Sequence, residues 1–222
     1  MIRTSFFMTF LILFGSSFIT ILEALTTPHD YIRHILNVET AVGFIAGYVY
    51  SIILSKLKDK DDFPDADTER DIMKLRYLDW MVTTPLLIIS LLLFIQSQSS
   101  TKIRWYQFMI PILLNYMMLF NGYVGEFMTP SKKIEGGILG FSFFALLVLS
   151  LYHALGSTSF FMKCIFACFV FIWSLYGVVY FIKDTKRKHI SYNILDLISK
   201  CFFGLFCWFY FIQIIDSKKT SL

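Results

Sequence analysis

Charged residues are scarce in this sequence of 222 residues, in which Asp, Glu, Lys and Arg together make up only 16%. Soluble domains usually carry about 25% charged residues. Here 56% of the residues are hydrophobic and the mean hydropathy is +0.63, which excludes an ordinary water-soluble domain and indicates a membrane protein. The net charge of +4 lies mostly in short segments between apolar stretches, so no nucleic-acid partner is predicted.

Cysteine is also rare: the sequence contains four, Cys164, Cys168, Cys201 and Cys207. All four fall within long apolar stretches, which favours buried thiols over structural disulfides. Their spacing is not that of a metal site, and no metal ligands are predicted.

Long apolar stretches recur along nearly the whole sequence, each close to the roughly 20 residues that a helix needs to cross about 30 Å of hydrocarbon. Turn and charge signals separate them. The first has no small-residue cleavage site after its apolar core, so we expect a retained helix and not a signal peptide. Seven spans leave no room for a soluble domain, and residues 1–222 are expected to form a single all-α membrane domain. The predicted spans are 5–25, 33–55, 73–95, 105–125, 134–155, 160–182 and 190–215.

Several ionisable residues fall inside these spans, where each is costly and is by default a functional candidate. Glu23 and Glu126 lie near the ends of their spans and are expected to reach the interface. The remaining ones lie deeper: Glu39, Arg76, Asp79, Asp196 and Lys200.

Asp196 and Lys200 are four residues apart, which places them on one face of a helix. Apolar residues are often no less stable than a buried ion pair, so structure alone is a weak reason for this pair. A desolvated lysine is, in contrast, the group that forms a Schiff base with an aldehyde. Lys200 is therefore a candidate for covalent attachment of a carbonyl cofactor.

The third span carries a polar stripe at spacings of 3, 4 and 7, formed by Arg76, Asp79, Thr83 and Ser90. Asp79 and Asp196 together balance the charges of Arg76 and Lys200, which makes the cluster tolerable at low dielectric constant. In the sixth span Trp173, Tyr176 and Tyr180 recur at spacings of 3 and 4. Beside Trp80 and a cofactor-binding lysine, we interpret this aromatic stripe as one wall of a slot for a flat polyene.

Three stretches, in this order and in these spans, resemble the microbial (type 1) rhodopsins: "RYLDWMVTTPLL" (76–87), "WSLYGVVY" (173–180) and "LDLISK" (195–200). The resemblance implies a seven-helix bundle that holds all-trans retinal as a protonated Schiff base on Lys200. It further implies that Asp79 is the proton acceptor, that Asp196 is the second carboxylate of the counterion, and that Arg76 sets their electrostatics. Tyr50 falls at the position that hydrogen-bonds Asp196. The positions of the retinal pocket fall on Trp80, Thr84, Met118, Gly122, Trp173, Tyr176 and Tyr180.

One departure from the family pattern bears on function. Proton pumps of this family usually place a carboxylate eleven residues after the acceptor, and here that position is Ser90. A hydroxyl cannot store a proton at neutral pH as a carboxylic acid can. Glu39 falls in the same half of the membrane, and we interpret it as a polar constriction in an ion path, with Asn37 and Asn193 as companions. Thr83 and Tyr50 belong to the same predicted path.

This combination resembles the rhodopsins of giant algal viruses that read Asp, Thr and Ser at the three motif positions, a group of light-gated channels. The resemblance implies a photoreceptor that passes monovalent cations or protons through the lipid bilayer, without enzymatic turnover. Three alternatives remain open: a light-driven outward proton pump with Glu39 as donor, a sensor that signals to a partner protein, and a seven-helix protein without retinal. The sequence also leaves homo-oligomerisation open.

The two indications of orientation disagree. Lys and Arg are more frequent on the side that holds the N-terminus, which the positive-inside rule places in the cytoplasm. The family resemblance places the N-terminus outside the cell. The acidic run 59–67 partly offsets the basic loops, so we expect an extracellular N-terminus.

Overall fold

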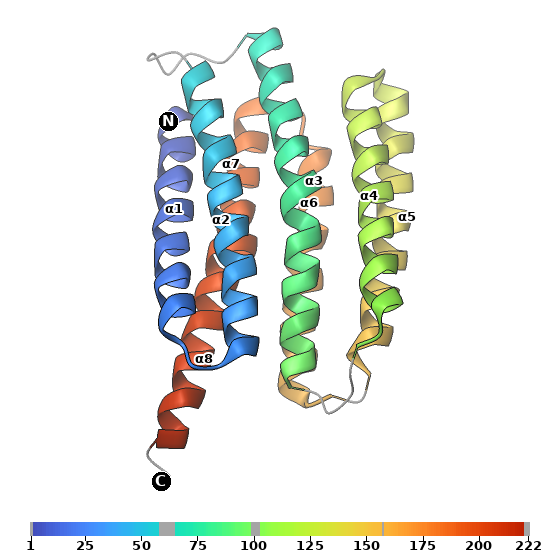
Figure 1. Cartoon of the computed structure of the whole chain (residues 1–222). Helices are drawn as coiled ribbons and strands as arrows, with labels where there is room; N and C mark the ends of the chain where they lie inside the picture. Colours follow the sequence, from blue (N-terminus) through green and yellow to red (C-terminus); the bar gives the residue numbers. More distant parts are fainter. Residues whose placement is uncertain (1, 58–64, 99–102, 157, 220–222) are drawn as a thin grey trace.

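The computed structural model describes residues 2–57, 65–98, 103–156 and 158–219, which form a bundle of long helices (Figure 1). Most of the acidic run that bears on orientation lies outside these residues. No strand occurs in the described part of the chain, and the predicted all-α fold is confirmed. The helices are α1 (Ile2–Thr26), α2 (Asp30–Lys56), α3 (Ala66–Ser97), α4 (Trp105–Phe127), α5 (Pro130–Leu155), α6 (Phe160–Tyr180), α7 (Thr185–Asp196), the π-helix η1 (Leu197–Phe202) and α8 (Phe203–Lys219).

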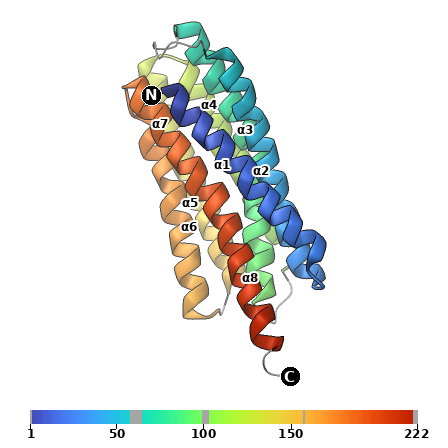
Figure 2. The ribbon, with the colours of Figure 1, turned by 90° about the vertical axis from the view of Figure 1, so that its left-hand side faces the viewer.

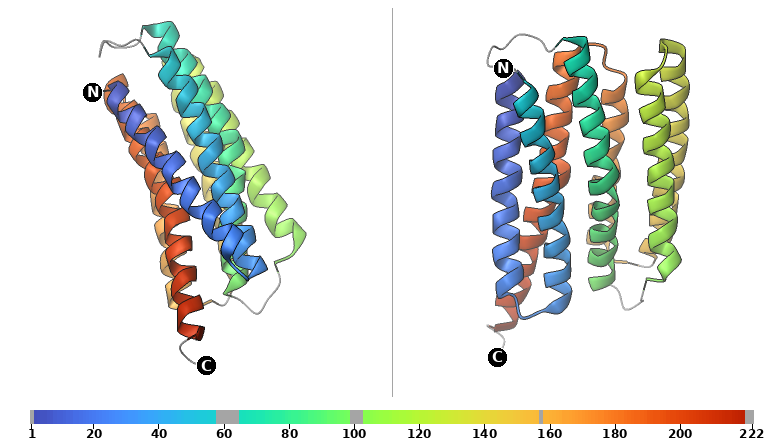
Figure 3. Two further views of the ribbon diagram at one scale, coloured as in Figure 1. Left: turned by 60° about the vertical axis from the view of Figure 1, so that its left-hand side comes forward. Right: turned by 45° about the horizontal axis from the view of Figure 1, so that its top comes forward.

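The last three elements follow one another without a loop and form one continuous helix, here called the C-terminal rod (Figure 2). Counted this way, the described residues contain seven helical segments that are long and apolar enough to cross a membrane. The predicted number of spans is therefore confirmed. In Figure 3 the rod runs beside α1, so the first and last spans close the bundle.

The two largest differences from the predicted span starts, at α3 and α7, arise because aspartates cap these helices. Asp65 accepts a hydrogen bond from the backbone N–H of Thr68 at 2.8 Å, and α3 therefore starts seven residues before the predicted span at 73. Asp184 accepts from the backbone N–H of Arg187 at 2.7 Å, and α7 starts at Thr185 and not at 190. Capping of this kind stabilises a helix start, so charged residues that resemble a loop form the first turns.

Small residues allow two helix pairs to pack closely, as is common in membranes. A Cβ atom added at Gly43 of α2 would lie 2.0 Å from the Ser17 hydroxyl of α1. A Cβ atom added at Gly136 of α5 would lie 2.7 Å from the backbone oxygen of Asn121 in α4. The α1–α2 and α4–α5 hairpins are therefore tight units, and the second is visible at one side of Figure 1.

The distribution of polarity is inverted relative to a soluble protein. Phe160 is 82% exposed and Leu25 is 75% exposed, whereas Arg76 is 1% exposed and Asp196 is fully buried. Apolar side chains on the outside suit contact with lipid, and ionisable side chains inside a bundle mark functional sites in membrane proteins.

Candidate functional site

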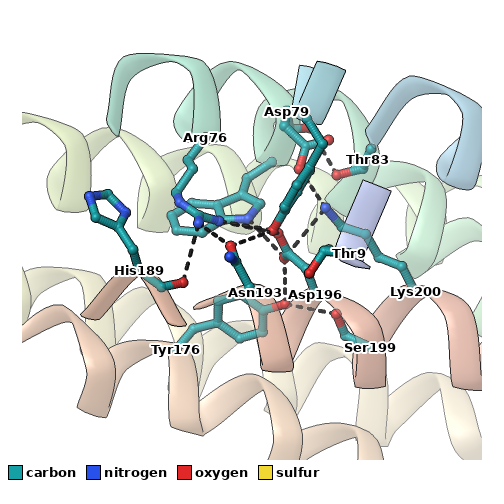
Figure 4. A network of polar contacts seen from close by, with 12 residues as sticks. Thr9, Arg76, Asp79, Thr83, Tyr176, His189, Asn193, Asp196, Ser199 and Lys200 are labelled. Carbon is teal, nitrogen blue, oxygen red and sulfur yellow. Dashed lines mark hydrogen bonds and ion pairs between the residues drawn. The ribbon is translucent and has the colours of Figure 1, made fainter. Parts of the chain in front are cut away.

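The amine of Lys200 lies between two carboxylates in the centre of the bundle (Figure 4). Its Nζ is 2.5 Å from Oδ2 of Asp79 on α3 and 3.4 Å from Oδ1 of Asp196 on the C-terminal rod. Lys200 itself belongs to η1, so the regular α-helix that the sequence predicts here is replaced by a wider π turn. Such π turns occur frequently at functional sites.

Asp196 accepts hydrogen bonds from three neutral donors on three other helices. The donors are the hydroxyl of Tyr50 at 2.7 Å, the hydroxyl of Tyr176 at 2.8 Å and Nε1 of Trp80 at 3.3 Å. Nη1 of Arg76 lies 3.5 Å from its Oδ2 atom. Hydrogen bonds to an ionised acceptor are the stronger kind, so these neighbours stabilise Asp196 as a carboxylate.

Asp79 has far fewer partners than Asp196. Its Oδ2 atom contacts Lys200, but its Oδ1 atom has no hydrogen-bond partner among the described residues. The hydroxyl of Thr83 donates to the backbone oxygen of Asp79 at 2.8 Å and not to its carboxylate. The two carboxylates beside the amine therefore differ in how firmly their charge is held.

Arg76 completes the charge balance of the cluster. Its guanidinium group donates to the hydroxyl of Tyr50 at 3.1 Å, to the backbone oxygen of His189 at 3.4 Å and to Oδ1 of Asn193. It also lies over the ring of Phe6, 5.0 Å from the ring centre, in cation–π geometry. Two cations and two carboxylates make the buried cluster neutral overall, which lowers the cost of burial.

A largely apolar cavity adjoins this cluster, and Lys200 contributes to its lining. On the side formed by α5, where the sequence has no tryptophan, Gly136, Phe141 and Phe144 are among the lining residues. Aromatic rings that lead to an amine fit retinal, which is a flat polyene aldehyde. All seven residues predicted for the pocket line this one cavity: Trp80, Thr84, Met118, Gly122, Trp173, Tyr176 and Tyr180.

Three polar residues at the site were not singled out from the sequence. Asn115 is fully buried on α4, and its amide donates to the hydroxyl of Thr84 at 2.8 Å. The hydroxyl of Ser199 lies 2.7 Å from that of Tyr176. His189 is fully buried, and neither ring nitrogen has a hydrogen-bond partner among the described residues. Asn115 could have been found, since an amide inside an apolar span is itself a signal.

Glu39 is 4% exposed, and neither carboxyl oxygen has a hydrogen-bond partner in the described part of the chain. The hydroxyl of Ser90, which is also buried without a hydrogen bond, faces this carboxyl group. Gly204 of the C-terminal rod lies close to this carboxyl group, since an added Cβ atom would lie 3.2 Å from Oε2 of Glu39. Glu39 and Ser90 therefore form a buried polar pair between α2 and α3.

Of the two asparagines predicted to accompany Glu39 in the ion path, Asn37 lies outside the bundle, and its part of the prediction is wrong. Asn193 contacts Tyr50 of the same predicted path, and its part stays a prediction. Asn37 is exposed on the outside of α2. Asn193 accepts a hydrogen bond from Tyr50 at 3.0 Å and donates to Ser5 at 2.9 Å, in the network around Arg76. Asn37 is two residues before Glu39, and residues two apart on a helix point in different directions, which explains why Asn37 is exposed while Glu39 is buried.

Glu126 lies in the last turn of α4 beside lysines of two neighbouring helices, and its expected position at the membrane interface stays a prediction. Its side chain is only 10% exposed and forms ion pairs with Lys188 and, at 3.3 Å, with Lys133. Because α7 begins at Thr185, Lys188 lies inside the bundle and is 3% exposed. Glu23 is half-buried near the end of α1, and its expected position at the membrane interface also stays a prediction.

The cysteines only partly follow the prediction of buried thiols. All four are free, and Cys201 and Cys207 are buried. Cys164 and Cys168 are exposed on the outer face of α6, where they would contact lipid. An apolar environment outside the bundle suits a thiol as well as the interior does.

Comparison with known proteins gives matches that extend over most of the chain. A family model described as bacteriorhodopsin-like protein matches residues 1–214. The opsin-like protein carO of Fusarium fujikuroi is 31% identical over 157 residues, which cover 63% of this chain and 48% of that protein. The chain thus spans about half the length of the curated relatives that it matches.

Solved structures match over the whole bundle. Viral rhodopsin OLPVRII is 34% identical with a TM-score of 0.85, and the match covers 96% of this chain and 98% of that chain. Xanthorhodopsin, described as a light-driven ion pump with dual chromophore, is 23% identical with a TM-score of 0.78, over 100% of this chain and 95% of that one. The second similarity shows a shared fold alone.

Proposed function

This chain belongs to the bacteriorhodopsin-like family, and from that premise we propose that it is a light-gated cation channel with retinal attached to Lys200. The family binds retinal through a Schiff base to a lysine, and the chain is an integral membrane protein with several spans. When bound, retinal supplies the absorption of visible light and a change of shape. Lys188 is also buried, but it pairs with Glu126, whereas Lys200 lines the cavity.

The hydrogen bonds of the two carboxylates support separate roles for them. Asp196 is held as a carboxylate by Arg76 and by three neutral donors, so it is poorly suited to accept a proton. Asp79 contacts Nζ of Lys200 through one oxygen, and the other oxygen has no partner among the described residues. We therefore assign Asp79 as principal counterion and proton acceptor. Transfer of a proton from Nζ of Lys200 to Asp79 removes the ion pair between these two residues, which is one of the links between α3 and the C-terminal rod.

The observation that carries the channel proposal is the unpartnered carboxyl group of Glu39 beside Ser90. Burial of a polar group without a hydrogen bond is costly, so packing does not explain this residue. A carboxyl group in an ion path attracts cations once water reaches it and it ionises, which gives the position a function. Ser90 occupies the place of the proton donor that pumps of the family carry.

The polar face of α1 extends this path along the bundle. In the middle of α1 the hydroxyl residues face inward, whereas Phe18 and Leu22 face outward at 55% and 62% exposure. The hydroxyl of Thr20 lies 2.8 Å from that of Thr40 on α2, the residue next to Glu39. The inward-facing hydroxyl residues are Thr9, Ser16, Ser17 and Thr20, all at most 9% exposed. They offer oxygens for water and cations where α1, α2 and the C-terminal rod meet.

A light-driven proton pump is the second candidate, and the same residue supports it. The carboxyl group of Glu39 faces Ser90 and could replace the missing donor by returning a proton towards Lys200. In a pump the substitution Glu39→Gln slows reprotonation, and a small acid such as azide restores it. In a channel the same substitution changes the size or the selectivity of the current.

Photocurrent measured against voltage separates the two candidates. A channel only lets ions flow down their gradient, so its current reverses at the equilibrium potential of the permeant cation, and we expect this result. Glu39→Gln should alter this current, whereas the control Glu23→Gln, at a half-exposed position at the end of α1, should not. An outward current that never reverses and persists without a gradient would reject the channel in favour of the pump.

A further inference from the structure

A second apolar cavity lies beside the proposed retinal cavity, between α6 and the C-terminal rod. The two cavities adjoin, because Trp173 and Ser199 line both of them. We call the second cavity the α6–η1 groove; besides the two shared residues it is lined by Cys164, Ile165, Cys168, Phe169, Ile172, Ile198, Phe202, Phe203 and Phe206.

The outer side of the α6–η1 groove faces the membrane. Cys164 and Cys168 are exposed on α6, and Phe202 of η1 is 59% exposed. All three lie within segments that are long and apolar enough to span a bilayer. Figure 2 shows α6 and the C-terminal rod diverging towards the end where the C-terminus lies. The groove is therefore reached sideways from the lipid.

The chemistry of the lining restricts what can enter. No charged side chain lines the groove, and the one hydroxyl group, that of Ser199, lies 2.7 Å from the hydroxyl of Tyr176. Besides Ser199, the lining has only the indole N–H of Trp173 and two weakly donating thiols, too few partners to replace the water around a sugar, a peptide or an ion, so polar guests are disfavoured. An apolar molecule dissolved in the bilayer is the class of guest that fits.

Routes from water to Lys200 are closed to such a molecule. On one side of the amine lies the buried network of Asp196 and Arg76. About one helical turn further along the C-terminal rod, Gly204 lies beside the carboxyl group of Glu39, which has no hydrogen-bond partner among the described residues. Desolvating these groups against a hydrocarbon chain would be costly. The α6–η1 groove, by contrast, has no charged side chain in its lining that would have to be desolvated. Its inner wall includes Trp173, whose ring centre lies 4.4 Å from that of Phe169.

We propose that the α6–η1 groove is the entrance through which retinal passes from the bilayer to the cavity at Lys200. Trp173 is the side chain that must move to connect the two cavities. This inference rests on the proposed attachment of retinal to Lys200 and adds the route by which retinal arrives. It makes the speed of pigment formation depend on residues that contact neither Lys200 nor its carboxylates.

The test follows the growth of the visible absorption band after all-trans retinal is added to membranes that contain the full-length, retinal-free protein. Cys168→Trp places a large ring in the groove, and we expect the band to form about tenfold more slowly, with unchanged final height and wavelength. Phe171→Trp is the matched control, because Phe171 is 64% exposed on the same helix and does not line the groove. This control should form its pigment at the wild-type rate.

A chemical variant of the experiment uses the wild-type thiols and does not depend on folding of a mutant. A pyrene maleimide attached to Cys164 and Cys168, with labelling verified by mass spectrometry, should slow pigment formation, and Cys164→Ser/Cys168→Ser should be insensitive to the reagent. Wild-type speed in both Cys168→Trp and the labelled protein would overturn the entrance while leaving the pigment intact. A wild-type protein that forms no band at all would instead reject the pigment at Lys200, and the entrance with it.

Discussion

Asp79 and Asp196 both reach the amine of Lys200, yet their surroundings differ at the level of single atoms. Asp196 has donors from α2, α3 and α6, whereas one oxygen of Asp79 has none in the described part of the chain. Two chemically identical groups that both form ion pairs with one cation can thus have different tasks. The distinction is invisible in the sequence, where both are an aspartate in an apolar span.

The first prediction at this scale concerns Asp79. Asp79→Asn removes a negative charge beside the cationic amine, and the attraction that it supplied is lost. We expect the absorption band of the pigment to move to longer wavelength at neutral pH, and titration of the wild type to acid should produce the same shift. Absorption spectra of the two proteins across pH test this. If Asp79→Asn left both the colour and the acid shift unchanged, Asp196 would be the principal counterion.

The second prediction concerns the attachment point. Lys200→Ala should give a protein that inserts and folds but develops no visible band with retinal, because no amine remains in the wall of the cavity. The control Lys132→Ala removes an exposed lysine of α5 and should keep the band. Covalent labelling after acid denaturation gives a second readout. Retinal fixed to another lysine in Lys200→Ala would show that the assignment is wrong.

At the scale of elements, the ion pair of Glu126 with Lys188 joins α4 to the C-terminal rod, and Lys133 adds α5. Glu126→Gln leaves Lys188 buried without its main anion, which typically costs about 3–5 kcal/mol. We expect a lower thermal midpoint for loss of the pigment band. The double substitution Glu126→Leu/Lys188→Met should recover most of the loss, because it removes both charges.

An exposed pair on α5 supplies the control for this measurement. Glu135 and Lys132 lie 2.6 Å apart, but their side chains are 56% and 58% exposed. Surface pairs contribute little, so Glu135→Gln should change stability by less than about 1 kcal/mol. Equal effects of Glu126→Gln and Glu135→Gln would mean that burial does not strengthen the inner pair.

The elements also show which features a sequence can reveal. Apolar length predicts all seven spans, and the spacing of Asp196 and Lys200 predicts that they share a face, because both depend on local periodicity. The π turn at Leu197–Phe202 carries no glycine or proline to announce it. The early starts of α3 and α7 depend on single capping aspartates within charged segments that resemble loops. The contact of Asn115 with Thr84 depends on packing between helices, which periodicity does not contain.

At the scale of the whole molecule, orientation in the membrane can be tested directly. We expect the N-terminus outside the cell, because the arrangement around Lys200 follows the family, although basic loops argue for the reverse. An epitope tag at the N-terminus should be stained by antibody in intact cells. A tag at the C-terminus, on the opposite side of an odd number of spans, should be stained only after permeabilisation. The reverse pattern would show that the loop charges decide the orientation.

The π turn has a consequence for how this chain tolerates change over evolutionary time. A π turn closes its hydrogen bonds five residues back and an α turn four, so the π turn holds about one residue more than the α turn that could replace it. Loss of one residue other than Lys200 from Leu197–Phe202 would let the segment close as a regular α-helix, and Asp196 before it and Gly204 after it could keep their neighbours. The same loss in an α-helical part of the C-terminal rod would rotate the rest of the rod by about 100°. A deletion of a single codon should therefore survive in descendants more readily within this segment than elsewhere in the rod.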